Sequence, residues 1–153
     1  MKSLKGFLAA ALGAAALLFG SVATADSVSV NTVGAGGYDL VSYQNGKKPI
    51  PGNGHFTATV NGVTYLFDNK SNLKTFNKNP DKYLPQYGGY CAFGAAVGKK
   101  FAGDPTVWEV VDGKLYLNLD NRIKADWSKD IPGYIKKADK NWKKIKNVPA
   151  SEL

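Results

Sequence analysis

The sequence predicts a small α+β domain in which β-hairpins pack with short helices and a C-terminal amphipathic helix. Two stretches of alternating apolar and polar residues, 55–68 and 104–120, are each interrupted by a two-residue turn signal, Asn61-Gly62 and Asp112-Gly113. A third stretch, 132–146, instead has apolar residues at spacings of three and four, which is the period of a helix. Strands that pair within hairpins and alternate with helices indicate an α+β fold rather than a parallel α/β fold.

The first 25 residues have the pattern of a cleavable export signal. Lys2 and Lys5 precede the apolar core "FLAAALGAAALLFG", and Ala23 and Ala25 occupy the small-residue positions of a cleavage site. An uncleaved membrane anchor is the alternative, because the apolar stretch approaches the length that spans a bilayer. Its high Ala and Gly content makes it a weak anchor. We therefore expect a signal peptide over 1–25, cleavage after Ala25, a periplasmic or secreted mature protein and no stable membrane insertion after cleavage.

The rest of the chain divides into an approach segment, a domain and a short tail. Residues 26–37 are small and polar and form the expected N-terminal approach segment. The domain is expected over 38–148, and the C-terminal tail over 149–153. Within the domain, "YDLVSYQ" (38–44) predicts a first strand, and the Gly, Pro and Asn content of 45–54 predicts a loop. No internal repeat is recognisable in the sequence.

The helices are expected after each hairpin. Two short helices are predicted within 71–86, the first capped by Ser71 and the second begun by Asn79-Pro80, because Pro suits the first turn of a helix. Two more are predicted over about 121–129 and 132–146. The apolar stripe of the last one consists of Ile131, Ile135, Ala138, Trp142 and Ile145.

The charge of the chain argues against a nucleic-acid partner. Twenty Lys and Arg residues against twelve Asp and Glu give a formal charge of +8, and loss of Lys2 and Lys5 leaves +6. Only Arg122 is an arginine, whereas nucleic-acid readers generally use arginine forks. We interpret the surplus of lysine as a contribution to solubility and as mild attraction to anions.

Soft metal ligands are scarce in the mature sequence. Removal of the leader takes away the single methionine, and the rest contains one thiol, Cys91, and one imidazole, His55. A structural zinc site uses four Cys or His ligands, and soft copper sites use thiolate, thioether or imidazole groups. A single copy of this chain therefore has too few donors for a dense soft-metal site, and it cannot form an internal disulfide.

The order of motifs resembles the exported, single-domain branch of the YHS-domain family. The matching segments are "GYDLVSY", "TATVNGVTYLF", "NPDKYLPQYGGYCAFG", "DPTVWEVVDGKLYLNL" and "WSKDIPGYIKKADKNW", which together cover about residues 38–142. The resemblance implies a small α+β module related to cysteine-rich metal-binding domains of copper and heavy-metal transporters and of some oxygenases. It therefore implies metal handling, although those relatives have several cysteines where this chain has Cys91 alone.

Cys91 is the centre of the predicted site. Gly88-Gly89 allow a sharp turn before it, and a thiol in the first turn of a following helix, with Lys99 or Lys100 near, would be activated. The expected ligand-binding residues are Cys91, Tyr87, Tyr90 and Phe93, and the expected metal ligands are Cys91 and His55. The alternative is that Cys91 is a small buried apolar residue, as free cysteines often are, with the tyrosines as core.

These residues predict a non-catalytic binding module for a soft metal ion such as copper, or for a small ligand, centred on Cys91. A metal-handling or redox protein is the expected partner. Two alternatives stay open: a thiol-redox or oxidative-stress protein that uses Cys91, and an accessory interaction domain with an inert buried cysteine. The chain has no G-x-S-x-G, H-E-x-x-H or phosphate-loop motif, so no catalytic residue is assigned and an independent enzyme is not expected.

Overall fold

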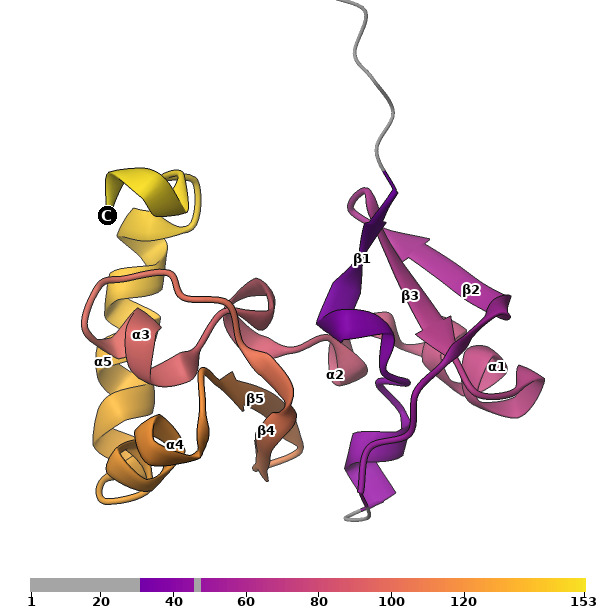
Figure 1. Ribbon diagram of the computed structural model, residues 1–153, viewed down its shortest axis with the longest axis horizontal. Helices are drawn as coiled ribbons and strands as arrows, with labels where there is room; N and C mark the ends of the chain where they lie inside the picture. The colour runs from indigo at the N-terminus through magenta and orange to yellow at the C-terminus, as the bar shows by residue number, and fades with distance from the viewer. Residues whose placement is uncertain (1–30, 46–47) are drawn as a thin grey trace, which may run out of the picture.

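The computed structural model describes residues 31–45 and 48–153, so the expected signal peptide and its cleavage site lie outside the described residues. Helices and two small β-sheets occur in the described part, which confirms the α+β fold class. Figure 1 shows two halves: residues 32–45 and 48–78, which include the first hairpin, lie on one side, and residues 92–152, which include the second hairpin and the long C-terminal helix, lie on the other.

The first half is built on a three-stranded sheet. Its strand order is β1-β3-β2, with β1 parallel and β2 antiparallel to β3. The predicted hairpin turn at Asn61-Gly62 is confirmed, because both residues have positive φ (51° and 77°), as the turn requires. The elements are β1 (Thr32–Val33), η1 (Gly34–Gly37), η2 (Ser42–Asn45), β2 (Asn53–Val60), β3 (Val63–Phe67), α1 (Lys70–Lys78) and α2 (Pro80–Tyr83).

The second half contains a two-stranded sheet covered by helices. The predicted hairpin around Asp112-Gly113 is confirmed as β4 paired with β5. The two last predicted helices are also confirmed, as α4 and α5. The elements are η3 (Gln86–Gly89), α3 (Ala92–Ala96), β4 (Asp104–Val111), β5 (Lys114–Asn118), α4 (Asn121–Trp127), α5 (Ile131–Ile145) and η4 (Ala150–Glu152).

The strand predicted over 38–44 is wrong. Beyond an isolated bridge from Tyr38, this segment forms a turn and the short helix η2. The cause is Asp39, which is fully buried and whose Oδ1 accepts a hydrogen bond from the Val41 N–H at 2.8 Å. The Ser42 hydroxyl also donates to the Asp39 carbonyl at 2.6 Å. Such local bonds from Asp and Ser compete with strand pairing and favour a turn.

Two further details differ from the expectation. The cap of α1 is Asn69 rather than Ser71, since the Asn69 side chain accepts from the Asn72 N–H at 2.9 Å. In addition, Thr32–Val33 pairs with β3, so part of the expected approach segment belongs to the folded domain. The second short helix does begin at Pro80 as predicted, with Pro in the first turn.

The core has two clusters that meet at the β4–β5 hairpin. Leu115 and Leu117 on β5 pack into the first cluster, with Phe67, Phe76 and other residues of the first half. Tyr116, between them in sequence, packs into the second cluster with residues of α3, α4 and α5. The alternation of a strand thus places this hairpin between the two halves, with one face on each cluster.

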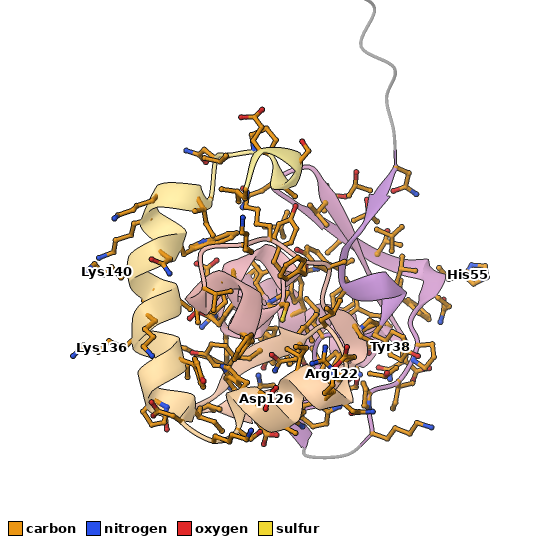
Figure 2. The ribbon with its side chains drawn as sticks, turned by 60° about the vertical axis from the view of Figure 1, so that its left-hand side comes forward. Tyr38, His55, Arg122, Asp126, Lys136 and Lys140 are labelled. Atoms are coloured by element: carbon orange, nitrogen blue, oxygen red, sulfur yellow. The ribbon has the colours of Figure 1, made fainter. Side chains whose placement is uncertain are left out.

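Helix α5 docks on the second cluster as the apolar stripe predicts. Ala138 and Ile145 are buried, and Ile135 and Trp142 are partly buried. Lys136 and Lys140 point away from the body of the protein (Figure 2). No helix among residues 31–45 and 48–153 combines the length and the apolar character needed to cross a bilayer.

Candidate functional site

Cys91 lies at the N-cap of α3 and is fully buried. Its Sγ accepts a hydrogen bond from the Gly94 N–H at 3.4 Å, and its thiol donates toward Asn118 Oδ1 at 3.7 Å. Its backbone N–H donates to the Phe101 carbonyl at 2.9 Å. The thiol is thus enclosed by α3 and β5 and offers no surface to a partner or a large ligand.

The two expected metal ligands are not brought together. His55 is an exposed residue of β2, an edge strand, and its side chain points away from the protein (Figure 2). Within the described ranges, no three His, Cys, Asp or Glu side chains come close enough to hold one ion. The arrangement around Cys91 therefore does not fit a soft-metal centre made by one copy of this chain.

The three aromatic residues expected around Cys91 have different surroundings. Tyr87 is buried and its hydroxyl donates to Asp139 Oδ1 at 2.9 Å. The ring of Phe93 packs on Tyr134 of α5, with 5.0 Å between ring centres. Tyr90 alone lines one of the two main cavities described below.

The larger cavity lies between the two halves, beside residues 85–100, which contain Cys91 and which we call the cysteine segment. Its volume is about 590 Å³, and it is lined by two glycine-containing turns, residues 34–36 and 88–90. We call it the glycine-turn pocket. The remaining lining residues are Thr32, Val33, Val63, Tyr65, Pro85, Ala102, Gly103 and Leu117. Cys91 does not line it, but Leu117, which does, pairs with Cys91 through an isolated β-bridge.

The lining of this pocket has no charged side chain, and it combines apolar side chains with hydroxyl and backbone polar groups. No Asp, Glu, Lys, Arg or His is among the lining residues, and the hydroxyl-bearing ones are Thr32, Tyr65 and Tyr90. Burial raises the pKa of Tyr65 above its usual value, so its hydroxyl stays neutral at physiological pH. The glycines add little side-chain bulk, so a ligand can approach the backbone closely.

Lys100 fixes the Tyr90 side of the pocket. Its Nζ donates to the carbonyls of Lys146 and Val148, at 2.9 and 2.6 Å, just beyond the C-terminal end of α5. The same ammonium group lies over the rings of Tyr90 and Trp142, 5.3 Å from each ring centre. The cation thus ties the pocket-lining tyrosine to α5, instead of activating the thiol as the sequence suggested.

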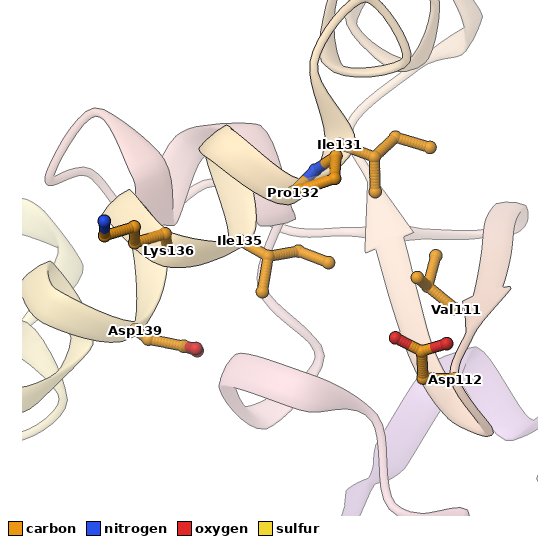
Figure 3. A pocket seen from close by; sticks show the side chains of 7 residues that line it. All are labelled: Val111, Asp112, Ile131, Pro132, Ile135, Lys136 and Asp139. Carbon is orange, nitrogen blue, oxygen red and sulfur yellow. The ribbon is translucent and has the colours of Figure 1, made fainter.

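A smaller cavity of about 340 Å³ lies between the β4–β5 turn and the first half of α5 (Figure 3). Its lining is partly charged, with Asp112, Lys136 and Asp139 beside apolar residues such as Val111 and Ile135. All three charged residues are exposed. The Tyr87–Asp139 bond lies at its edge. Burial and this hydrogen bond raise the pKa of Tyr87.

Sequence reasoning missed most of the glycine-turn pocket. Residues 34–36 were expected in an approach segment, and Tyr65 and Leu117 were expected in strands without a role in a site. The available signal was the repeated triplet Gly-Gly-Tyr, at 36–38 and 88–90.

Comparisons of the chain with protein-family models, with curated proteins and with solved structures give no match. The candidate site is therefore defined by the contacts and cavities of this chain. Of the two cavities, the glycine-turn pocket is the one that the cysteine segment lines.

Proposed function

We propose that this chain is an exported, non-catalytic binding module of the YHS type, and that it binds a small uncharged organic molecule in the glycine-turn pocket. The observation that carries the proposal is the pocket itself: about 590 Å³, lined by the cysteine segment and without a charged side chain. Clefts of this size with apolar walls and a few polar groups are the usual form of small-molecule sites.

The lining sets the chemical class of the ligand. A charged group placed in the pocket would lose water without gaining a partner of opposite charge, which is costly. An apolar body is favoured instead, since it covers the side chains of Val33, Val63 and Leu117. The hydroxyls of Tyr65 and Tyr90 can orient one or two neutral hydrogen-bonding groups on the ligand.

The soft-metal and thiol-redox alternatives both require Cys91 Sγ to be reached from outside. The thiol is fully buried and has no imidazole beside it. These features favour the pocket over the thiol as the binding site. Rapid alkylation of Cys91 by iodoacetamide in the folded protein would instead favour those alternatives.

Filling the pocket should abolish binding while the fold is kept. Ala102 lines the pocket and is exposed, so the side chain introduced by Ala102→Trp can occupy the pocket without entering the core. We expect the wild-type protein to bind the neutral apolar dye N-phenyl-1-naphthylamine saturably. Ala102→Trp should weaken that binding by about tenfold or more, a loss of about 1.4 kcal/mol. Fluorescence titration measures both affinities.

Ala125→Trp is the matched control, because Ala125 is an exposed alanine on α4 that lines neither cavity. It should leave the dye affinity unchanged within about twofold, a difference of about 0.4 kcal/mol. Equal affinities of the two variants, or the absence of saturable binding by the wild type, would contradict the proposal.

A further inference from the structure

The two glycine turns have the same backbone conformation. Ala35, Gly36 and Gly37 have φ values of 48°, 57° and 80°, and residues 87–89 have 55°, 62° and 83°. A tyrosine follows each run, Tyr38 or Tyr90, and its N–H donates to the carbonyl of the first residue of the run at 3.1 Å. Three successive positive φ angles are rare, so the recurrence is a specific one.

The residues after these turns are held by the same bonds. The N–H of Asp39 donates to the Ile50 carbonyl at 2.8 Å, and the N–H of Cys91 donates to the Phe101 carbonyl at 2.9 Å. Two residues after each of these acceptors, a glycine N–H donates back to the last glycine of the turn: Gly52 to the Gly37 carbonyl, and Gly103 to the Gly89 carbonyl. Asp39 and Cys91 therefore occupy equivalent positions, and both are fully buried.

The hairpins that follow have the same register. The paired positions of β2 and β3 match those of β4 and β5 at an offset of 51, from Asn53 to Asp104, and the register shift falls at the same place. At the same offset, the Asn53 and Asp104 side chains each accept a hydrogen bond from the N–H two residues ahead.

The helices after the hairpins are equivalent too. Asn69 and Asp120 cap α1 and α4 through the same kind of bond, to the N–H three residues ahead. An aromatic pair also recurs at the offset of 51. Tyr65 packs on Phe76 with ring centres 5.9 Å apart, and Tyr116 packs on Trp127 with ring centres 5.7 Å apart.

We infer that the chain is an internal duplication of one turn–hairpin–helix unit, and that Cys91 is the counterpart of Asp39: a positioning residue that holds the second glycine turn against the pocket. The sequence has no recognisable repeat, whereas the structure has one, because the two copies share backbone geometry more than residue identity. The link to the pocket rests on the proposed function, whereas the duplication does not.

The surroundings of Cys91 support its role as the counterpart of a carboxylate. Asp39 accepts hydrogen bonds from the N–H groups of Val41 and Asp68. The Phe93 and Leu119 N–H groups stand at the equivalent positions of the second copy, and in the wild type the Phe93 N–H donates to Asn118 Oδ1 at 3.4 Å. Among the described residues, two buried side-chain donors have no partner, Asn118 Nδ2 and Trp127 Nε1. Both donors belong to the second copy, and the first copy has phenylalanines, Phe67 and Phe76, at the equivalent positions. Asn118 also contacts the Cys91 thiol through its Oδ1.

The test is to place a carboxylate at this position. In the full chain, Cys91→Asp is compared with Cys91→Val, a control of similar size without polar atoms. If Cys91 is the counterpart of Asp39, the new carboxylate receives the Phe93, Leu119 and Asn118 N–H groups in addition to the Gly94 N–H that the thiol accepts in the wild type. The melting temperature, followed by circular dichroism at neutral pH, should then lie within about 4 °C of that of Cys91→Val or above it.

If those three groups do not reach position 91, the carboxylate has only the Gly94 N–H at the N-cap, and a fully buried charge with a single donor is strongly destabilising. Failure of Cys91→Asp to fold, or melting more than about 4 °C below Cys91→Val, would overturn the inference. If Cys91→Val does not fold, the wild type takes its place with the same limits.

The role in positioning is tested by dye binding of the same variants. The affinity of Cys91→Asp for N-phenyl-1-naphthylamine should stay within about threefold of wild type, a difference of about 0.7 kcal/mol. Cys91→Val removes the thiol's contact with Asn118 Oδ1 and offers no acceptor to Asn118 Nδ2, so it should bind the dye more weakly than Cys91→Asp. The reverse order of affinities would contradict the positioning role. If the wild type binds no dye, the proposed function fails, but the melting comparison still decides the duplication.

Discussion

Replacing Asp39 with alanine is expected to lower the free energy of unfolding by about 3–5 kcal/mol. The Asp39 carboxylate has no exposed surface and accepts three hydrogen bonds, from the Val41 N–H at 2.8 Å, the Asp68 N–H at 3.0 Å and Asn72 Nδ2 at 2.7 Å. These bonds join the first glycine turn, the end of β3 and the start of α1. Alanine would leave all three donors without their acceptor, and each such loss costs about 1–3 kcal/mol.

Urea denaturation with circular dichroism measures this loss. Asp39→Asn keeps an acceptor oxygen for one donor, so it should lie between wild type and Asp39→Ala. Asp81→Ala is the control, because Asp81 is an exposed carboxylate on α2, and it should change stability by about 0.5 kcal/mol at most. A loss below about 1 kcal/mol for Asp39→Ala would show that the carboxylate does not organise this turn.

Gly103→Ala is the second substitution expected to have a large effect. A Cβ at Gly103 would lie 2.5 Å from the Gly89 carbonyl oxygen and 2.7 Å from Leu117 Cβ, closer than real Cβ contacts. The backbone of the second glycine turn would have to move, and we expect a cost of about 1–3 kcal/mol or more, as for other overpacked sites. Because Gly89, Gly103 and Leu117 all line the glycine-turn pocket, dye affinity should fall in the same variant.

Gly54→Ala is the matched control for this substitution. A Cβ at Gly54 meets no atom within 4 Å, and its φ lies outside the positive range. The change should therefore be neutral or stabilise the protein by about 0.4–1 kcal/mol, because alanine restricts the unfolded chain. Thermal and urea unfolding of both variants measure the difference, and equal stabilities would show that the close approach at Gly103 is not present in solution.

The elements that local pattern controls were predicted well. Both hairpins follow from alternation around Asn61-Gly62 and Asp112-Gly113, and α5 follows from its apolar spacing. The segment 38–44 was wrong because its conformation depends on bonds between Asp39 and residues about 30 positions away, Asp68 and Asn72. Alternation within seven residues contains no information on such contacts.

The candidate site was less accessible to sequence reasoning. The sequence identified the cysteine segment, and Tyr90 does line a cavity, but no pattern shows whether a lone thiol is buried. His55 was paired with Cys91 because it is the single imidazole, whereas the structure places it on an exposed edge strand. The pocket is formed by turns about 50 residues apart, and their contact depends on how the two halves pack.

The most direct test of the account is to map dye binding on the folded protein by NMR. Amide chemical shifts of ¹⁵N-labelled protein would be recorded during titration with N-phenyl-1-naphthylamine. We predict saturable shifts for residues 34–36, 88–90 and 102–103, which line the glycine-turn pocket, and none for Ile135 or Asp139 in the smaller cavity or for His55. Shifts confined to the smaller cavity, or no saturable shift at all, would contradict it.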